Sequence, residues 1–403
     1  MKCRSCNVKL KTIFLNLGKS SVANSLISNS KLNAKKYNLQ VYICETCWLS
    51  QTNDLVDYKE IFNSHYPYFS GYSKIWLNHL NKFVKYIKLN FPNKLKGNVY
   101  EIASNDGSLL KILEKNNIKA IGIEPTRSTF LYSKKKGFKV INSFFSYKFA
   151  RKVKEKSDFI IANNVLAHVP DLNDFIKGIK TFLNLNGVAT FEIQYLMNLI
   201  KFNQFDTVYH EHFSYFSITS ANYVFTKHGL KIFDCEKINT HGGSIRLFVS
   251  HFSNSKLNKS KRLIRYLKQE RKNGITSRKF YINFEKKIKV LKKNVNILIN
   301  KSVKEKKKIV AYGAAAKANT FFNYMNINNS KIKCIIDKNP FKVGKHLPGS
   351  KIPIKQKSYL NKIKPDFIFI MTWNIKDEII KELMFTKKWR CKFVTFMPKI
   401  KIF

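Results

Sequence analysis

Short apolar segments alternate with segments of helix length through the middle of the chain, and this alternation restricts the fold more than any other feature. The apolar segments that have the length of strands are 98–104, 119–125, 138–143, 157–164 and 187–195. Strands separated by helices in this way predict a doubly wound parallel sheet. Two further segments, 230–238 and 243–252, have the pattern of a strand pair that closes the same sheet.

A second α/β pattern begins at residue 306, with strands expected at 331–337 and 366–373. Between the two patterns, residues 256–308 are rich in lysine and carry apolar residues at helical spacing, which predicts one or two long connecting helices. A chain of 403 residues is also too long for one ordinary core. We therefore expect an α/β protein with three parts: a small N-terminal unit over 1–75, a doubly wound domain over 76–254, and a helical connector with a second Rossmann-like α/β domain over 255–403.

Four cysteines near the N-terminus form two Cys-x-x-Cys pairs: Cys3, Cys6, Cys44 and Cys47. In a cytosolic protein such pairs are more typical of zinc than of disulfides, and four thiolates satisfy tetrahedral zinc. Two unrelated pairs of buried cysteines are the alternative. Because four protein ligands leave no open position for substrate, we expect a structural zinc on which the N-terminal unit depends for folding.

The loop EIASNDGSLL, residues 101–110, leads from a predicted strand into a predicted helix. Its polar residues would surround a bound ligand, and Glu124, after the next strand, is placed to hydrogen-bond a ribose diol. The loop lacks the GxGxxG phosphate clamp, which favours a ligand with ribose and adenine but no pyrophosphate, such as S-adenosylmethionine. A plain structural turn is the alternative interpretation of this loop alone. The candidate cofactor-binding residues are Glu101, Ser104, Asn105, Asp106, Gly107, Glu124, Ser143, Phe144, Asn163 and Asn164.

The run FDTVYHEHFSYFS, residues 205–217, places Glu211 between two histidines in a chain in which acidic residues are scarce. One of the two histidines, His210 or His212, could serve as a general base, Glu211 could orient a ring, and the hydroxyl of Tyr209 could donate to an oxyanion. Two histidines could instead ligate a metal, but such a pair usually needs a third ligand at suitable spacing. His168 follows the fourth predicted strand, at the edge where α/β ligands bind. From these residues alone, catalytic and structural roles are equally open.

Two glycine- or alanine-rich stretches, HGGSIR (241–246) and YGAAAKAN (312–319), offer anion sites in two different domains. Glycines allow close backbone approach, an arginine can fork onto a phosphate, and a strand-to-helix turn has free amides. Together the stretches suggest a diphosphate clamped between the domains, and tight strand–helix packing, which runs of Gly and Ala often indicate, is the alternative. The candidate substrate-binding residues are Gly243, Ser244, Arg246, Lys317 and Asn319.

The formal charge of +49 comes almost entirely from lysine, with nine arginines in the chain. Specific nucleic-acid binders tend to use arginine forks and stacking aromatics in recognisable modules, and no such module is evident. We therefore expect a solvated lysine surface that favours anionic substrates, and no nucleic-acid partner. No apolar run approaches the roughly 18 residues of a membrane span, and MKCRSCNVKL lacks an apolar signal segment. We expect no membrane partner and a cytoplasmic location.

The chain resembles the C-methyltransferases that act on nucleotide-linked 4-keto deoxysugars, and the resemblance runs in the family's order from residue 3 to about residue 374. It is carried by CRSC, LGKSSVANSL, CETCWLSQT, EIASNDGSLL, GIEPT, FDTVYHEHFSYFS, HGGSIR, YGAAAKANTFFNY, DKNPFKVGKHLPG and TWN. The chain departs from the family at Ala103 and Ala318, where glycine is usual. The resemblance implies a zinc-binding domain, a class I methyltransferase domain and a C-terminal α/β domain that helps to hold a sugar nucleotide.

The resemblance also implies an activity and the roles of the site residues. The enzyme would use S-adenosylmethionine to methylate carbon 3 of a nucleotide-linked 4-keto-6-deoxysugar through an enolate, with dTDP as the expected nucleotide. His212 would be the base, with Tyr209 and Glu211 in the same site. His168 would lie near the reacting sugar, and either it or Tyr209 would face the enolate oxygen. A tyrosine of the zinc unit, Tyr68 or alternatively Tyr66 or Tyr72, would be part of a lid. The alternatives are methylation of a different nucleotide sugar or position, and a non-catalytic nucleotide- or nucleic-acid-binding protein.

Overall fold

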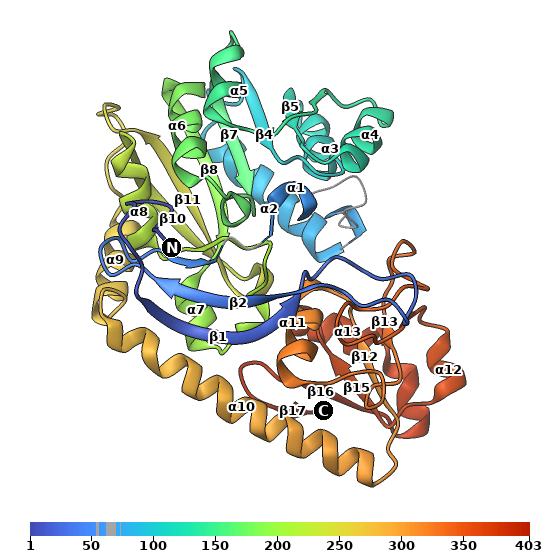
Figure 1. Ribbon diagram of the computed structural model, residues 1–403. Coiled ribbons are helices and arrows are strands. Elements are labelled where there is room, and N and C mark those ends of the chain that lie inside the picture. The colour runs from blue at the N-terminus through green and yellow to red at the C-terminus, as the bar shows by residue number, and fades with distance from the viewer. Residues whose placement is uncertain (54–55, 62–69, 73) are drawn as a thin grey trace.

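The computed structural model describes residues 1–53, 56–61, 70–72 and 74–403. These residues form three β-sheets with their covering helices (Figure 1). The central unit lies at the top of Figure 1 and the C-terminal unit at the lower right, with strands β1 and β2 of the N-terminal unit between them. Among the described residues, no helix is both long enough and apolar enough to cross a membrane.

The central sheet has seven strands in the order β10-β11-β8-β7-β4-β5-β6. Neighbours from β8 to β6 are parallel, and β11 runs antiparallel to both β8 and β10. The predicted doubly wound sheet and its closing strand pair are therefore confirmed. The strands are β4 (Val99–Ile102), β5 (Ala120–Ile123), β6 (Val140–Ile141), β7 (Ser157–Asn163), β8 (Leu183–Gln194), β10 (Leu230–Ile238) and β11 (Ser244–His251).

Both faces of the central sheet are buried because its strands alternate apolar side chains between two helical layers. Phe159 and Ile161 of β7 pack against the layer of α2 and α3. Ile160 and Ala162 pack against the opposite layer, which includes α6, α8 and α9. The helices of this unit are α2 (Lys74–Asn90), α3 (Ser108–Lys115), α4 (Arg127–Lys135), α5 (Tyr147–Lys152), α6 (Leu172–Phe182), α7 (Leu196–Lys201), α8 (Ile218–Lys227) and α9 (Lys261–Lys272).

The C-terminal unit repeats this architecture with a six-stranded sheet in the order β14-β13-β12-β15-β16-β17. All its neighbouring strands are parallel except β16 and β17. Its strands are β12 (Ile309–Tyr312), β13 (Ile335–Ile336), β14 (Ile354–Lys355), β15 (Phe367–Ile370), β16 (Lys392–Thr395) and β17 (Lys401–Ile402). Its helices are α11 (Ala316–Met325), α12 (Tyr359–Ile363) and α13 (Lys376–Glu382). The second Rossmann-like fold expected from the sequence is confirmed.

The N-terminal sheet contains β1 (Thr12–Ser21), β2 (Lys36–Ile43), β3 (Ser50–Thr52) and β9 (Ser214–Tyr215), in that order. The sequence predicts none of these strands. The fourth strand, β9, comes from the run 205–217, so the zinc unit and this run share one sheet. The long connecting helix α10 (Arg278–Lys304) places Phe284 and Ile288 in one core with residues of β1 and of the C-terminal unit. The short helix α1 (Tyr58–Ile61) follows β3.

Candidate active site

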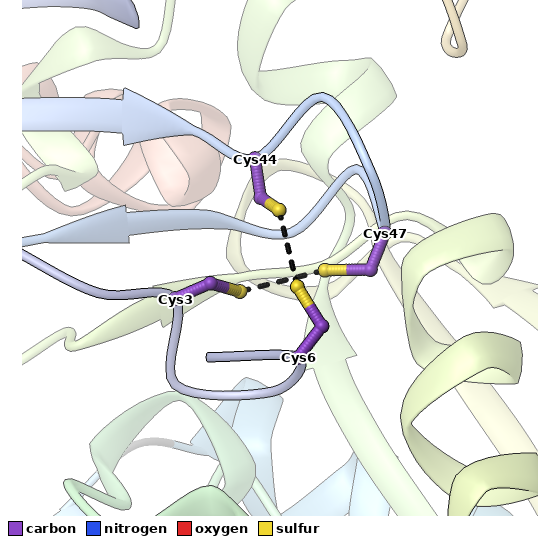
Figure 2. A group of neighbouring side chains, drawn as sticks. All are labelled: Cys3, Cys6, Cys44 and Cys47. Atoms are coloured by element: carbon purple, nitrogen blue, oxygen red, sulfur yellow. Dashed lines mark hydrogen bonds between the residues drawn. The ribbon is translucent and has the colours of Figure 1, made fainter. Parts of the chain in front are cut away.

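The four cysteines of the N-terminal unit converge from two turns into one cluster (Figure 2). The sulfur atoms of Cys3 and Cys47 lie 3.5 Å apart and those of Cys6 and Cys44 lie 3.4 Å apart. All four sulfurs lie within 4.8 Å of one another. Zinc–sulfur bonds of about 2.3 Å require sulfurs separated by roughly 3.8 Å in a tetrahedron, so the cluster fits a structural zinc ion.

A cavity of about 480 Å³ lies where the three units meet. The central unit contributes the loops that follow β4, β5 and β7, and the C-terminal unit contributes the loops that follow β12 and β15. The two Rossmann-like sheets therefore present their carboxyl ends to the same space, which is the edge at which α/β proteins bind ligands. The N-terminal unit adds Asn24, Tyr58 and Ser70.

The part of the cavity nearest β4 contains buried polar atoms with no protein partner among the described residues. These atoms are Oε2 of Glu101, Oγ of Ser104 and both polar atoms of the Asn163 side-chain amide. Burial, and then the charges of Asp106 and Glu124, raises the pKa of Glu101 well above its usual value. Because a buried polar atom is costly without a partner, these side chains fit a polar ligand such as the methionine end of S-adenosylmethionine. Ser143, Phe144 and Asn164 line the same cavity.

Glu124 directly follows β5 and lines the cavity, and it also holds the loop after β4. Its carboxylate accepts hydrogen bonds from the amides of Asn105 and Thr126, each at 2.8 Å, and from Oγ1 of Thr129 at 3.0 Å. Burial raises the pKa of Glu124, and these hydrogen bonds act in the opposite direction. A carboxylate oriented by backbone amides at this position can still accept from ribose hydroxyls through its remaining lone pairs.

Two of the predicted cofactor residues shape the loop and do not line the cavity. Asp106 accepts from the amide of Gly71 and from Oγ of Ser70, both at 2.8 Å, so it fastens the segment 70–71 onto the loop. Gly107 has φ 76°, and a Cβ there would lie 2.6 Å from the ring of Phe138. Asp106 and Gly107 therefore shape the loop, and their direct contact with the cofactor stays a prediction.

The histidines of the run 205–217 differ sharply in their surroundings. His212 and Tyr209 line the cavity with ring centroids 4.0 Å apart, and the ring of His168 lies 4.7 Å from that of His212. His210 instead faces the ring of Tyr37 and is buried away from the cavity. Tyr68, the expected lid residue, lies outside the described residues.

Backbone carbonyls fix the tautomers of the two cavity histidines. Nδ1 of His212 lies 3.0 Å from the carbonyl oxygen of Thr207, and Nδ1 of His168 lies 2.8 Å from that of Glu211. Because a carbonyl only accepts, each Nδ1 carries a proton, and each neutral ring has its lone pair on Nε2. Burial lowers the pKa of His168 to about 4, so this ring is neutral near pH 7.

Glu211 lines the cavity with His212, and its role in orienting the His212 ring stays a prediction. Its carboxylate accepts two hydrogen bonds from Nδ2 of Asn24, at 2.8 and 2.7 Å, and the carbonyl of Thr207 holds His212. Asn24 was missed as a site residue although it lies within LGKSSVANSL, one of the stretches that carry the family resemblance. A pairing across 187 residues leaves no local signal in the sequence.

Lys317 lies on the cavity side of the C-terminal unit, as predicted, together with Lys342, which was missed. Nζ of Lys317 donates to Oδ1 of Asn374 at 2.6 Å and lies over the ring of Trp373. Burial lowers the pKa of Lys317 to about 8, an effect opposed by the nearby charge of Asp206. Asp206 is itself buried, which raises its pKa to about 7, and it accepts from Nε1 of Trp373 at 2.7 Å.

Arg246, the phosphate-binding candidate, forms its ion pairs away from the cavity. Its guanidinium pairs with Glu192 at 2.9 Å and with Glu236 at 3.1 Å, and it lies over the ring of Phe83. Only 3% of the Arg246 side chain is exposed, so its guanidinium group binds its partners inside the central unit. Arg246 does not line the cavity.

The other three substrate-binding candidates also serve packing. Nδ2 of Asn319 donates to the carbonyl of Ser21, which joins α11 to β1. Gly243 has φ 106°, and a Cβ there would lie 2.0 Å from the amide nitrogen of Asn198. Ser244 donates to the carbonyl of Thr240. The alternative of tight packing, stated for these stretches above, therefore accounts for Gly243, Ser244 and Asn319.

Comparisons with known proteins place the chain in a family. Three family models match it: a zinc binding domain over residues 3–62, a methyltransferase domain over 76–234, and a C-methyltransferase C-terminal domain over 239–398. The C-methyltransferase NovU of Streptomyces niveus is 26% identical over 384 residues, which cover 94% of this chain and 91% of that protein.

Solved structures give weaker likenesses. Magnesium protoporphyrin IX methyltransferase of Synechocystis PCC 6803 with bound S-adenosylmethionine has a TM-score of 0.38 and 13% identity, covering 50% of this chain and all of that chain. The PH0226 protein of Pyrococcus horikoshii has a TM-score of 0.37 and 15% identity, covering 49% of this chain and 99% of that one.

The three family matches and the C-methyltransferase relative define an S-adenosylmethionine-dependent methyltransferase with a zinc-binding N-terminal unit. The chain belongs to the S-adenosylmethionine-dependent C-methyltransferase family, as the resemblance implied, and it is an enzyme.

Proposed function

We propose that this enzyme methylates carbon 3 of a nucleotide-linked 4-keto-6-deoxysugar, with dTDP as the nucleotide. The observation that carries the proposal is the meeting of His212, Tyr209 and Lys317 in the same cavity as the cofactor loop. A base beside a phenol suits enolate formation next to a ketone, and a buried cation suits a phosphate-bearing substrate.

His212 is the base in this mechanism. A carbon accepts a methyl group from a sulfonium only when it carries electron density, which the carbon next to a ketone gains when it loses a proton. The hydrogen bond from Nδ1 of His212 to the carbonyl of Thr207 supports this role, since it leaves the lone pair on Nε2. Bound S-adenosylmethionine would supply the electrophilic methyl group, held by the loop 101–105, Asn163 and Glu124.

Tyr209 is the donor to the enolate oxygen. The alternative donor is His168. Its Nδ1 donates a hydrogen bond to the carbonyl of Glu211, and burial keeps the ring neutral by lowering its pKa. Its Nε2 therefore presents a lone pair, which would repel a developing oxyanion. The phenol ring of Tyr209 lies against His212, with centroids 4.0 Å apart, so base and donor act from adjacent rings.

Lys317 and Lys342 would hold the diphosphate. Lys342 donates to the carbonyl of Ala314 at 2.8 Å, which keeps it beside the turn that carries Lys317. Because burial depresses the pKa of Lys317, an anionic ligand beside its ammonium group would restore the charged form and gain from it. The two lysines lie on the C-terminal unit, so the nucleotide end of the substrate would contact this unit while the sugar reaches His212.

Transfer of label from S-adenosylmethionine to a panel of nucleotide 4-ketosugars tests the proposal. We expect methylation of the dTDP-linked 4-keto-6-deoxysugar, with the methyl group at carbon 3 by NMR of the product. A methyl group at another carbon would refute the assigned position. Transfer to a ketosugar on another nucleotide only would refute the assigned nucleotide. A panel that accepts no label, tested with zinc-replete protein that binds S-adenosylhomocysteine, would refute the substrate class.

A further inference from the structure

Arg4 lies inside the first zinc knuckle, between Cys3 and Cys6, and its side chain contacts the run 205–217. Nη1 of Arg4 donates to the carbonyl oxygens of Thr52 at 2.9 Å and of Phe213 at 2.7 Å. The guanidinium also lies over the ring of Phe213, 5.3 Å from its centroid. Arg4 is 9% exposed, so these contacts are sheltered from water. The Arg4 side chain of the knuckle therefore binds Phe213, the residue that follows His212.

Thr52 of β3 holds the same piece of main chain. Its amide donates to the carbonyl of Phe213 at 3.1 Å, and its Oγ1 donates to the carbonyl of His212 at 3.0 Å. From the other side, the amide of Phe213 donates to the carbonyl of Ala167 at 2.8 Å. The main chain at residues 212–213 is thus held between the zinc unit and the turn that carries His168.

We propose that Arg4 and Thr52 are positioning residues that couple the zinc cluster to the placement of His212, an inference that rests on the role of His212 proposed above. Neither residue touches the cavity. Their donors fix the two carbonyls on either side of the Cα of Phe213, and the His212 ring is attached one residue earlier. A displacement of about 1 Å in a reacting group can lower the rate by about 10²-fold. A more mobile main chain at residues 212–213 would therefore lower kcat.

The alternative is that these contacts only stabilise the fold, and variants can separate the two roles. Thr52→Val removes the hydroxyl that binds His212 and preserves the shape of the side chain. Arg4→Met removes both bonds to the carbonyls, and Arg4→Lys restores a cation that can donate to one of them. Thr12→Val is the matched control, because Oγ1 of buried Thr12 donates to Glu45 in the second knuckle and not to the run 205–217.

Four measurements apply to each variant: zinc content, affinity for S-adenosylhomocysteine, hydrogen exchange of the peptide 205–217, and kcat with KM. For Arg4→Met we expect one zinc per chain, unchanged affinity, and a kcat lower by about 10–100-fold with KM within about threefold. Thr52→Val should lower kcat by about 3–10-fold, and Arg4→Lys should recover part of the Arg4→Met loss. In both Arg4→Met and Thr52→Val, amides of 205–217 should exchange faster while those of β7 are unchanged. Thr12→Val should match the wild type.

The outcomes distinguish this inference from the proposed role of His212. If Thr52→Val and Arg4→Met retain zinc, wild-type kcat and wild-type exchange in 205–217, the coupling is refuted. If Arg4→Met fails to fold, Thr52→Val with wild-type kcat and exchange is enough to refute it. If 205–217 loosens in these variants but His212→Asn leaves turnover intact, the coupling stands and the base assignment is wrong. Equal loss of kcat in Thr12→Val would show that the knuckles act through general stability, which also refutes the inference.

Discussion

Replacing Tyr209 by phenylalanine tests which side chain stabilises the enolate oxygen. The phenylalanine ring can keep the packing against His212, where the two ring centroids lie 4.0 Å apart, so the change removes the hydroxyl alone. The matched change is His168→Asn, in which the side-chain amide can still donate to the carbonyl of Glu211 as Nδ1 of His168 does. The two variants therefore compare the loss of a proton donor with the loss of a neutral ring.

The size of each effect follows from the protonation states. Removal of one oxyanion donor typically costs about 10²–10³ in kcat, and we expect a loss of this size for Tyr209→Phe. His168 is neutral, because burial lowers its pKa to about 4, and its Nε2 has no proton to donate. We therefore expect His168→Asn to lower kcat by less than about tenfold. KM for both substrates should change little in either variant.

Single-turnover transfer of a labelled methyl group measures the chemical step in both variants. Solvent deuterium exchange at the carbon beside the ketone, with S-adenosylhomocysteine in place of the methyl donor, isolates enolate formation. Tyr209→Phe should slow exchange and methyl transfer together. The reasoning fails if His168→Asn is the more damaged variant in both assays, since His168 would then donate to the oxyanion as its other tautomer.

Four further outcomes are expected. Glu124→Ala should weaken S-adenosylhomocysteine binding by about 1–3 kcal/mol, the scale of a charged hydrogen bond, and calorimetry that finds equal affinity would argue against the ribose assignment. Cys44→Ser should abolish the bound zinc and destabilise the N-terminal unit, which metal analysis and thermal unfolding can check. Ala103→Gly should stabilise the protein by roughly 0.5–1 kcal/mol, because Ala103 has φ 55° in the left-handed region; a lower melting temperature would contradict this. KM for the nucleotide sugar should rise above pH 8 as Lys317, whose pKa is lowered to about 8 by burial, loses its charge; Lys317→Arg should remove that rise, and a pH-independent KM in the wild type would oppose the phosphate role.

The sequence predicts the two Rossmann-like sheets well because their strands are buried on both faces. Runs such as SDFIIANN contain several consecutive apolar residues when helices cover both sides, and this pattern is visible without any tertiary information. The N-terminal strands lack this signal. In β2 only every second residue from Leu39 to Ile43 is buried, and Lys36 is exposed, so this strand has no continuous apolar run like those of the two Rossmann-like sheets.

The residues of the candidate site also differ in how well the sequence predicts them. Residues at strand ends, such as Glu101, Glu124 and Asn163, are predictable since parallel strands bring their carboxyl ends to one edge. Arg246 was placed wrongly because a buried arginine and a phosphate-binding arginine look alike in sequence, and only its pairing with Glu192 separates them. Asn24 and Lys342 depend on contacts between units, which a single sequence does not reveal.

The dense aromatic composition of FDTVYHEHFSYFS follows from the contacts of this run with all three units. Phe205 packs against Phe321 and Tyr324 of α11 in the C-terminal unit. Phe213 lies beneath Arg4 of the zinc knuckle, and the ring of Tyr209 lies against that of His212. Polar contacts also reach both neighbouring units: Asp206 binds Trp373 of the C-terminal unit, and Glu211 binds Asn24 of the N-terminal unit. A run buried from three sides needs apolar bulk between its polar groups, so the aromatic residues pack it against each unit and hold the His212 main chain in place.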